Sequence, residues 1–389
     1  MKKLAIAMCL MVPAASASAV QNLKLGGVEV KPVVIVTEKY DSNIYLTKDL
    51  VRASYFNRSS VGLGFMNNEA GRLNVTGAYT LEVLNYARDY RSNNAVHQTG
   101  ELGLKEKLAG DRTIALNDKY MTTTDQATSE LTQRARRISN VAGLEFLSPL
   151  KGKFGFGIDA THTINDYLSS NNKTLDRDEI LAGVSVDYKL QPKTKVFAAY
   201  HFGSLKYEER TLAGSNDAVY SNVDLGMTGN IAPKLTGTVA GGAQFRLYRK
   251  DLNDSSNSRT TGGYSAQLKW LPMAKSEVIW YGKRANIEST FGDSRFYTST
   301  INDLSCTHEI NKFKAGVGVG YEDVRYPEET IGTNAKRHDG NSSVRASLDY
   351  NIQKWLKAGV SHTYKTRMSN EHGNNYVDNV SAIEIKGLF

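Results

Sequence analysis

Apolar and polar residues alternate along much of this chain with a period of two, which is the period of a β-strand. In Leu235–Arg249 the odd positions are mostly apolar and the even positions mostly small or polar. Ser343–Ile352 alternates in the same way, whereas Ser276–Ile287 alternates poorly because Trp280 and Tyr281 fall on opposite faces. Similar runs occur at Leu73–Val83, Phe154–Ile164, Ile180–Leu190, Val219–Met227 and Tyr264–Trp270. The pattern predicts a protein built from strands.

Short clusters of turn-forming residues separate pairs of these runs at an interval of about 41 residues. They are Asn67–Gly71, Ala109–Arg112, Pro149–Gly152, Gln191–Lys193, Ala232–Lys234, Pro272–Lys275, Asn311–Lys312 and Gln353–Lys354. Longer polar stretches lie midway between them, at Tyr40–Val51, Arg88–Asn94, Thr124–Gln133, Ser169–Thr174, Leu212–Asp217, Asp251–Arg259, Thr290–Ser294, Pro327–Asn341 and Ser369–Asn375. Short turns that alternate with longer loops are typical of the two rims of an outer-membrane barrel.

Eight short turns join sixteen strands, and one further strand at each end, Gly27–Glu38 and Asp378–Phe389, makes eighteen. We therefore predict an all-β fold, a transmembrane antiparallel up-and-down barrel of about eighteen strands, with sixteen as the alternative. The short turns and both termini would be periplasmic and the longer loops extracellular. A propeller blade would hold four strands in each period, and this period holds two.

The N-terminus has the features of an export signal. Met1–Lys3 is basic, Leu4–Val12 is apolar, and Ala17–Ala19 resembles a cleavage site. We predict a cleaved signal peptide at residues 1–19 and a single barrel domain at residues 20–389. The apolar run is too short to span a membrane as a helix. We also predict that the terminal aromatic residue, Phe389, contributes to assembly.

Composition further limits the class of protein to which the chain can belong. No segment after the N-terminal run has 18 consecutive apolar residues, which argues against helical membrane spans. The mean hydropathy of −0.41 is compatible with a barrel, because only every second residue of a barrel strand faces lipid. The net charge of +8 is spread along the chain instead of clustered, so we expect no nucleic-acid partner. Anionic solutes or lipopolysaccharide phosphates suit such a surface better.

The alternation also predicts which charged residues line the interior of the barrel. These are Glu101, Lys105, Glu145, Asp159, Asp187, Lys189, Asp224, Arg246, Lys269, Arg345, Asp349, Lys357 and Lys365. A barrel of eighteen strands is wide enough for an aqueous channel, and both signs of charge argue against strong ion selectivity. We see no loop long enough to fold deeply into the lumen. Any constriction would come from wall side chains or from modest loops such as Thr124–Gln133 and Pro327–Asn341.

Catalytic, cofactor and metal sites are not expected. The seven His residues are scattered singly, without a His-Glu-x-x-His motif or paired-Cys spacing. Ser361 and His362 are adjacent and would point to opposite faces of a strand. Cys306, the one cysteine outside the signal peptide, is interpreted as a lone wall residue. Six tyrosines near strand ends are interpreted as an aromatic girdle at the membrane interface, with carbohydrate stacking as an alternative: Tyr86, Tyr167, Tyr207, Tyr248, Tyr326 and Tyr364.

Several segments resemble the type-two family of putative beta-barrel porins. They are Val36–Tyr45 with its acidic-Asn-aliphatic-aromatic motif, the Pro-basic turn Ile231–Leu235, Phe296–Thr300, and the C-terminal stretch from Trp355 to Phe389. The resemblance implies an outer-membrane channel, and some members are associated with exopolysaccharide systems. Passive diffusion of small hydrophilic solutes is therefore the leading hypothesis. Exopolysaccharide export and a non-conducting structural barrel are the alternatives. The resemblance also implies that Phe389 is read by the outer-membrane insertion machinery, and outer-membrane lipid and lipopolysaccharide are the other expected partners.

Overall fold

The computed structural model describes residues 23–67, 71–130, 134–150, 152–208, 216–249, 258–290, 294–330 and 335–389. The predicted signal peptide therefore lies outside the described residues. Three short 3₁₀ helices occur in loops: η1 (Arg88–Asn93), η2 (Ser170–Leu175) and η3 (His372–Asn374). None of the helical segments in the described ranges has the length and apolar character of a membrane-spanning helix.

Almost all of the regular structure is β-sheet. The strands are β1 (Leu23–Leu25), β2 (Val28–Asp41), β3 (Ser54–Asn67), β4 (Leu73–Tyr86), β5 (Ala95–Lys107), β6 (Thr113–Thr123), β7 (Arg137–Pro149), β8 (Phe154–Tyr167), β9 (Arg177–Gln191), β10 (Thr194–Tyr207), β11 (Ala218–Ala232), β12 (Leu235–Tyr248), β13 (Ser258–Trp270), β14 (Ser276–Glu288), β15 (Phe296–Ile310), β16 (Phe313–Glu329), β17 (Lys336–Asn351), β18 (Leu356–Ser369) and β19 (Tyr376–Leu388).

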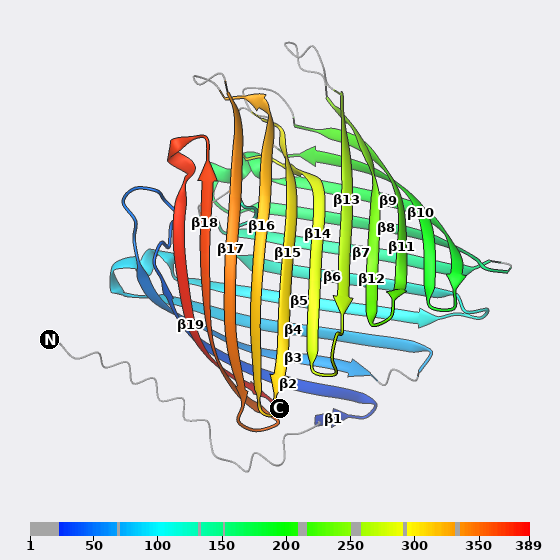
Figure 1. Cartoon of the computed structure of the whole chain (residues 1–389), viewed down its shortest axis with the longest axis horizontal. Coiled ribbons are helices and arrows are strands. Elements are labelled where there is room, and N and C mark those ends of the chain that lie inside the picture. The colour runs from blue at the N-terminus through cyan, green and yellow to red at the C-terminus, as the bar shows by residue number, and fades with distance from the viewer. Residues whose placement is uncertain are drawn as a thin grey trace.

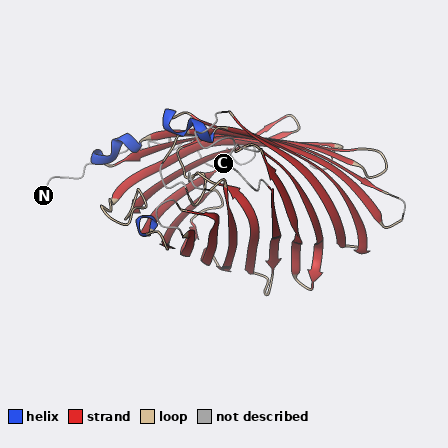
Figure 2. Cartoon of the chain, turned by 90° about the horizontal axis from the view of Figure 1, so that it is seen from above, coloured by secondary structure: helices blue, strands red, loops and turns tan. Residues whose placement is uncertain are grey.

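Strands β2 to β19 form a closed antiparallel barrel with an oval outline when seen from above (Figures 1 and 2). Each strand pairs with the next along the chain. β19 closes the ring by pairing with β2, from Val380 opposite Asp41 to Leu388 opposite Val33. β1 is a short extra strand that pairs with the start of β2, where Leu23 lies opposite Val30. The predicted up-and-down barrel of eighteen strands is confirmed, with β1 in addition.

The predicted alternation separates an apolar outer face from a polar inner face. Leu225, Val317 and Ile383 are more than 60% exposed and point outward with most of the other exposed large apolar side chains. Ser, Thr, Gly and charged residues occupy the intervening inner positions. Because a barrel has no unpaired edge where its ladders are complete, its backbone polar groups are satisfied within the wall.

The eight predicted short turns fall between consecutive strands that meet at one rim of the barrel, although residues 68–70 and 151 of two of them lie outside the described residues. The turn at Asn311 and Lys312 shows why such residues occur there. Asn311 adopts φ 54°, a left-handed conformation that asparagine tolerates better than most residues. The longer connections lie at the opposite rim, which we call the long-loop rim.

One predicted loop, Pro327–Asn341, is wrong in its extent. β16 continues to Glu329 and β17 begins at Lys336, and the two pair as far as Glu329 opposite Lys336. Toward this end the outward positions become polar, with Asp323, Arg325 and His338. The alternation of apolar and polar residues therefore ends before the pairing of β16 with β17 ends. For this reason the sequence of these strand ends resembles that of a loop.

The tyrosine girdle is also largely wrong. Of the six tyrosines, only Tyr364 faces outward, at 38% exposure. Tyr86, Tyr167, Tyr248 and Tyr326 are buried. These four and Tyr207 lie on the inner face, near the long-loop rim. There most of them pack against other aromatic and apolar side chains. The Tyr86 ring, for example, stacks on Phe56 with 4.6 Å between the ring centroids. Outward aromatic residues do occur at both ends of the strands, at positions that the sequence argument did not choose: Tyr55, Phe202, Phe245 and Tyr321 near the long-loop rim, and Phe154, Trp270, Phe313 and Tyr350 near the short turns.

The wall is incomplete between β13 and β14. The two strands pair only from Trp270 opposite Val278 to Tyr264 opposite Arg284. Beyond Arg284, among the residues that the structure describes, β13 pairs only with β12 and β14 only with β15. In Figure 1, β13 continues straight toward the long-loop rim, whereas the upper part of β14 bends away from β13. The strand with the poorest alternation in the sequence is thus the one that leaves the regular ladder.

Contacts show that the upper part of β14 passes inside the neighbouring wall. Asn286 and Glu288 share a face with the outward Arg284, yet they contact inward-facing side chains of β12. Asn286 Nδ2 donates to Gln244 Oε1 at 2.9 Å, and Glu288 forms an ion pair with Arg246. A small core fills the overlap: Leu205, Ala218, Tyr248 and Phe296. Here the wall has two layers, β10–β13 outside and β14–β15 inside.

Candidate functional site

The inner face of the barrel carries the thirteen charged residues that alternation selected. Strand pairing places all of them on the face opposite the exposed apolar side chains: Glu101, Lys105, Glu145, Asp159, Asp187, Lys189, Asp224, Arg246, Lys269, Arg345, Asp349, Lys357 and Lys365. They are distributed around the whole ring and do not converge on one point. That they line a conducting pore stays a prediction.

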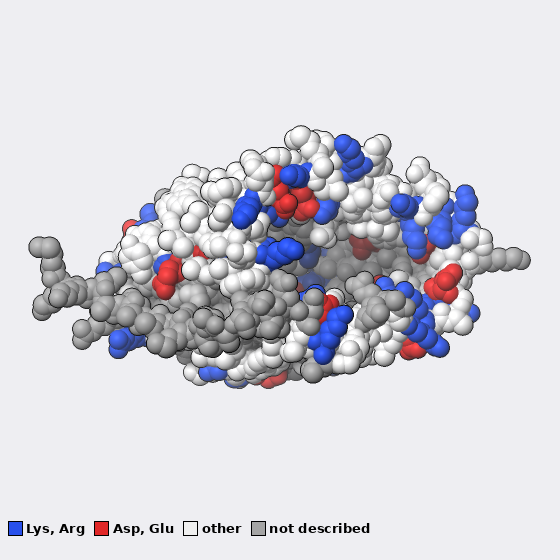
Figure 3. Space-filling model, turned by 90° about the horizontal axis from the view of Figure 1, so that it is seen from below, with Lys and Arg blue, Asp and Glu red and all other residues white. Residues whose placement is uncertain are grey.

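Many of these residues form ion pairs with neighbours on the wall. Lys119 Nζ lies 2.7 Å from Glu101 Oε1, and Lys195 Nζ lies 3.1 Å from Asp187 Oδ2. Lys269 pairs with Glu277 across β13 and β14. The inner face therefore combines both signs of charge at short range, and Figure 3 shows both signs around a hollow on the face seen from below.

Glycines let some of these pairs reach across an intervening strand. Arg345 of β17 contacts Asp303 of β15, with Nη2 2.6 Å from Oδ2. Its guanidinium lies over Gly318 and Gly320 of β16, where a Cβ on Gly318 would be only 2.9 Å from Arg345 Nη2. His201 of β10 likewise lies over Gly183 of β9 and approaches Asp159 of β8 at 3.3 Å. These side chains lie against the wall over the glycines.

The loop after β6 turns into the barrel and is anchored at both ends. We call its described residues 124–130 the crossing loop. At the near end, Arg58 of β3 bridges Glu82 of β4 at 2.7 Å and Asp125 of the loop at 2.9 Å. His97 of β5 contacts Glu82 through Nδ1 at 3.0 Å, and its Nε2 accepts the backbone N–H of Thr124, also at 3.0 Å. This pattern places the ring proton on Nδ1.

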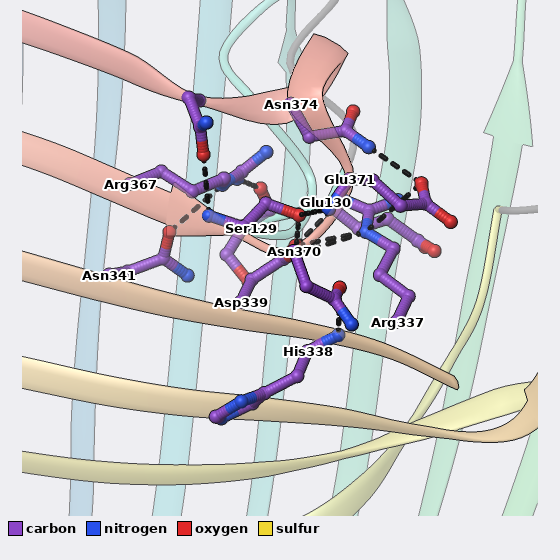
Figure 4. A network of polar contacts seen from close by, with 12 residues as sticks. Ser129, Glu130, Arg337, His338, Asp339, Asn341, Arg367, Asn370, Glu371 and Asn374 are labelled. Carbon is purple, nitrogen blue, oxygen red and sulfur yellow. Dashed lines mark hydrogen bonds and ion pairs between the residues drawn. The ribbon is translucent and has the colours of Figure 1, made fainter. Parts of the chain in front are cut away.

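The far end of the crossing loop binds the opposite wall (Figure 4). The backbone carbonyl of Ser129 accepts a hydrogen bond from Arg367 of β18, and its hydroxyl donates to Glu322 of β16 at 3.2 Å. Glu130 accepts from the Ser289 hydroxyl at 2.7 Å and from the Thr290 hydroxyl at 2.9 Å. In the ring of eighteen strands, β14 and β16 each lie eight strands from β6, nearly opposite it, and β18 lies six strands away. The loop therefore spans the lumen.

This arrangement corrects the expectation that no loop folds deeply into the lumen. A loop of modest length spans it because inward side chains extend toward the loop from both walls. The sequence analysis named this loop as a source of constriction but missed its anchors, Arg58, Glu322 and Arg367. Arg58 lies two residues from the inner-face Ser60, and Arg367 lies two residues from the inner-face Lys365. The alternation that selected the other inner-face charges therefore also selects these two arginines.

Buried arginine–carboxylate contacts hold the wall around the far anchor. Arg337 Nη2 donates to Asp339 Oδ2 at 2.7 Å, and both side chains are at most 3% exposed. Arg367 Nε donates to Asn341 Oδ1 at 2.9 Å, and its guanidinium lies 5.0 Å from the centroid of the Tyr376 ring. Because each arginine has several partners at once, the attachment point of the loop is a rigid part of the wall.

Few contacts within the described residues resemble catalytic or metal chemistry. Ser276 and His308 are neighbours across β14 and β15, with the hydroxyl 2.7 Å from Nδ1. No carboxylate contact of His308 is seen among the described residues, and those residues contain no group of three potential His, Cys, Asp or Glu metal ligands. Ser361 and His362 do point to opposite faces of β18. The absence of an enzymatic activity stays a prediction.

Comparison with known proteins agrees with the fold. Residues 21–388 match the family model described as putative beta-barrel porin 2. No curated protein matches the chain. The outer membrane protein opdK from Pseudomonas aeruginosa is 8% identical, covers 92% of this chain and 99% of its own, and gives a TM-score of 0.50. OccAB4 from Acinetobacter baumannii is 11% identical, covers 92% of this chain and 98% of its own, and gives a TM-score of 0.48.

At 8% identity the opdK structure shows only a shared barrel fold, whereas the family model extends over almost the whole chain. The closed ring of eighteen strands, with its apolar outer face and charged inner face, is the fold expected of that family. This chain belongs to the putative beta-barrel porin 2 family, a family of porin-like outer-membrane barrels.

Proposed function

We propose that the protein is an outer-membrane channel for passive diffusion of small hydrophilic solutes, and that the crossing loop sets the size of the solutes that pass. The observation that carries this proposal is a closed barrel of eighteen strands with a polar inner face and one loop fixed across it. Barrels of this size enclose water. A loop held at both ends narrows the water path without closing the barrel wall.

The charge distribution supports weak ion selectivity. Inner-face carboxylates lie beside lysines and arginines, as in Glu101 with Lys119 and Asp303 with Arg345. The net charge of +8 indicates at most a modest preference for anions. In this proposal the short turns and both termini are periplasmic and the long-loop rim is extracellular.

The crossing loop weighs against export of a polysaccharide. A polymer chain would have to pass beside a loop that is held by Arg58 at one end and by Arg367 and Glu322 at the other. The inner tyrosines do not form an open stacking surface either, because Tyr86, Tyr248 and Tyr326 are buried. Diffusion of small solutes is compatible with both observations, and we propose no enzymatic activity.

The test is conductance of the purified protein in planar bilayers, combined with exclusion of sugars and polyethylene glycols of graded size. The wild type should show discrete conductance steps. The triple variant Glu130→Ala/Glu322→Ala/Arg367→Gln, which removes the three far-end anchors of the loop, should conduct more per step and admit larger solutes. A matched control is Lys365→Gln, which removes an inner-face charge on the same strand and leaves the loop anchored.

Three results are decisive. Absence of any conductance step would show a non-conducting barrel. Unchanged step size and size limit in the released variant would show that the crossing loop is not the constriction. A size limit wide enough for long polysaccharide chains in the wild type would favour export.

A further inference from the structure

The gap between β13 and β14 is a second polar site. A cavity of about 200 Å³ lies there. Its lining includes inward-facing residues of β11 and β14, such as Asp224 and Lys283, and outward-facing residues of β13 and β14, such as Gly262 and Arg284. Residues of both faces of the barrel wall therefore surround the cavity.

The backbone along this gap lacks a strand partner. β13 pairs with β12 along its whole length, but toward β14 its pairing stops at Tyr264. Arg284 Nε donates to the carbonyl oxygen of Gly262 at 3.1 Å, so that carbonyl points into the gap. In an antiparallel strand the N–H and C=O of one residue point to the same side, and alternate residues repeat this direction. The N–H groups of Gly262 and Thr260 consequently also point into the gap.

Unpaired N–H groups in the hydrocarbon region are unfavourable by several kcal/mol each, and open sheet edges facing lipid do not occur there. The outward neighbours of this edge on β12 are apolar, since Phe245 lies opposite Thr260 and Leu247 lies opposite Ser258. A partner that accepts hydrogen bonds is needed to complete the edge. Space is available for it on the outer face, because a Cβ on Gly262, which would point outward, would meet no heavy atom within 4 Å.

Two cations flank the same gap from opposite sides. Lys283 points inward and Arg284 outward, both are exposed, and they stand where the pairing of β13 with β14 ends. Neither makes an ion pair with any residue that the structure describes. An outward-facing arginine on the lipid side of a barrel is destabilising unless it reaches the interface or an anion. The site thus presents two positive charges and two N–H donors, together with one carboxylate, that of Asp224.

We propose that the gap between β13 and β14 binds the phosphate group of an amphipathic molecule that enters from the side of the barrel. The phosphate oxygens accept from the N–H groups of Gly262 and Thr260 and pair with Lys283 and Arg284. The apolar part lies along the outer wall beside Phe245 and Tyr264. A membrane lipid is the expected source, because the gap opens on the outer face; a free phosphate reaching the gap from the lumen is the other.

The experiment measures how fast a maleimide labels a cysteine placed in the gap of the purified barrel in a neutral detergent. The labelled protein carries Cys306→Ser, to remove the native thiol, and Gly262→Cys, which the free space accommodates. Dodecyl phosphate should slow labelling by about tenfold, the effect expected of one or two charge-assisted hydrogen bonds. Dodecyl maltoside, which has a neutral head, should not slow it.

Two controls separate specific binding from general shielding. Val360→Cys, outward and on the fully paired β18, should be labelled at the same rate with either amphiphile. Lys283→Gln/Arg284→Gln in the Gly262→Cys protein should lose most of the protection. If the double substitution lowers the yield of folded barrel, each single substitution should give part of the same loss. Inorganic phosphate that protects as well as dodecyl phosphate would identify free phosphate as the source, and protection by dodecyl phosphate alone would identify a lipid.

The proposal is overturned if dodecyl phosphate gives no protection, if dodecyl maltoside protects equally, or if protection survives removal of both positive charges. Each of these results would mean that the two cations and the N–H groups do not select a phosphate group. Conductance is measured on the same preparations, so failure of this site and failure of the proposed channel are distinguishable.

Discussion

At the scale of single residues, glycine decides how much of the lumen is open. Arg345 spans β16 to reach Asp303 only because Gly318 and Gly320 have no side chain beneath it. The same arrangement holds His201 over Gly183. Long charged side chains would otherwise project toward the axis of the barrel, where they would occupy the path of solutes.

Substitution of Gly318 by Val should therefore lower conductance. A valine Cβ would lie within 3 Å of Arg345 Nη2, so the arginine must leave the wall and project into the lumen. Gly143→Ala is the matched control, because its nearest foreign atom would be the Ala160 carbonyl oxygen at 3.9 Å. Single-channel recordings should show smaller steps for Gly318→Val and unchanged steps for Gly143→Ala. Equal steps in both variants would mean that Arg345 does not limit the path.

The pair Arg246 and Glu288 should matter for stability more than for transport. Their side chains are 3% and 9% exposed and join the two overlapping layers of the wall. Arg246→Met leaves Glu288 buried without its partner, which should lower the free energy of unfolding by about 3–5 kcal/mol. The double variant Arg246→Met/Glu288→Leu should recover most of that loss. Urea unfolding in detergent, followed by heat-modifiable gel migration, measures both, and a loss below 1 kcal/mol for the single variant would show that the pair is solvated.

Sequence reasoning identified the face of each charged residue but not its partner. The odd-even alternation of the strands placed Arg345 and twelve other charged residues on the inner face, because a period of two fixes the side to which each residue points. Pairings across two strands, such as Arg345 with Asp303, depend on which intervening residue is glycine. Tyr326 and Tyr86 were assigned to the lipid interface because residue type was given more weight than parity.

At the scale of strands and loops, the sequence predicted the turns better than the irregular features. All eight short turns and the strand count follow from residues whose backbone preferences are local. The crossing loop and the overlap of β14 depend on contacts between distant segments, such as Ser129 with Arg367 and Asn286 with Gln244. Only the poor alternation of Ser276–Ile287 signalled that one strand departs from the regular ladder.

Neighbouring positions on β18 should differ sharply in their tolerance of charge. Val360 points outward and is 51% exposed, whereas Ser361 points to the lumen. Val360→Lys should destabilise the barrel in lipid vesicles by roughly 2–4 kcal/mol if it lies near the middle of the bilayer, because the charge then faces lipid. Ser361→Lys should change stability little. Urea titration in vesicles measures the difference, and equal values would contradict the assignment of the two faces.

At the scale of the whole molecule, the C-terminal residue Phe389 packs against the barrel and also has a proposed role in assembly. The Phe389 ring stacks on Trp355 at 5.5 Å between centroids, and its N–H donates to the Pro32 carbonyl oxygen at 3.0 Å. The strand itself, β19, ends one residue earlier, at Leu388. Phe389 is therefore placed at the short-turn rim, where both a packing role and the proposed role as an assembly signal are compatible with its position.

Deletion of Phe389 should reduce the amount of folded barrel in the outer membrane more than it changes conductance. Trp355→Leu removes the stacking partner but keeps the terminal aromatic residue, so it should assemble nearly normally if recognition of Phe389 is what matters. Heat-modifiable protein in membrane fractions measures assembly, and bilayer recordings measure the channel. Equal defects in both variants would show that Phe389 acts through packing alone.

The pairing of β19 with β2 also determines when the protein can become stable. Its partners, such as Val380 and Asp41, are separated by nearly the whole chain, so this ladder is the least local of all. Until the last strand is made, β2 and every partial sheet carry a free edge that can pair with other chains. A chain that stops short of β19 should therefore aggregate or be degraded instead of forming a smaller barrel, and survival of the protein between synthesis and closure depends on protection of that edge.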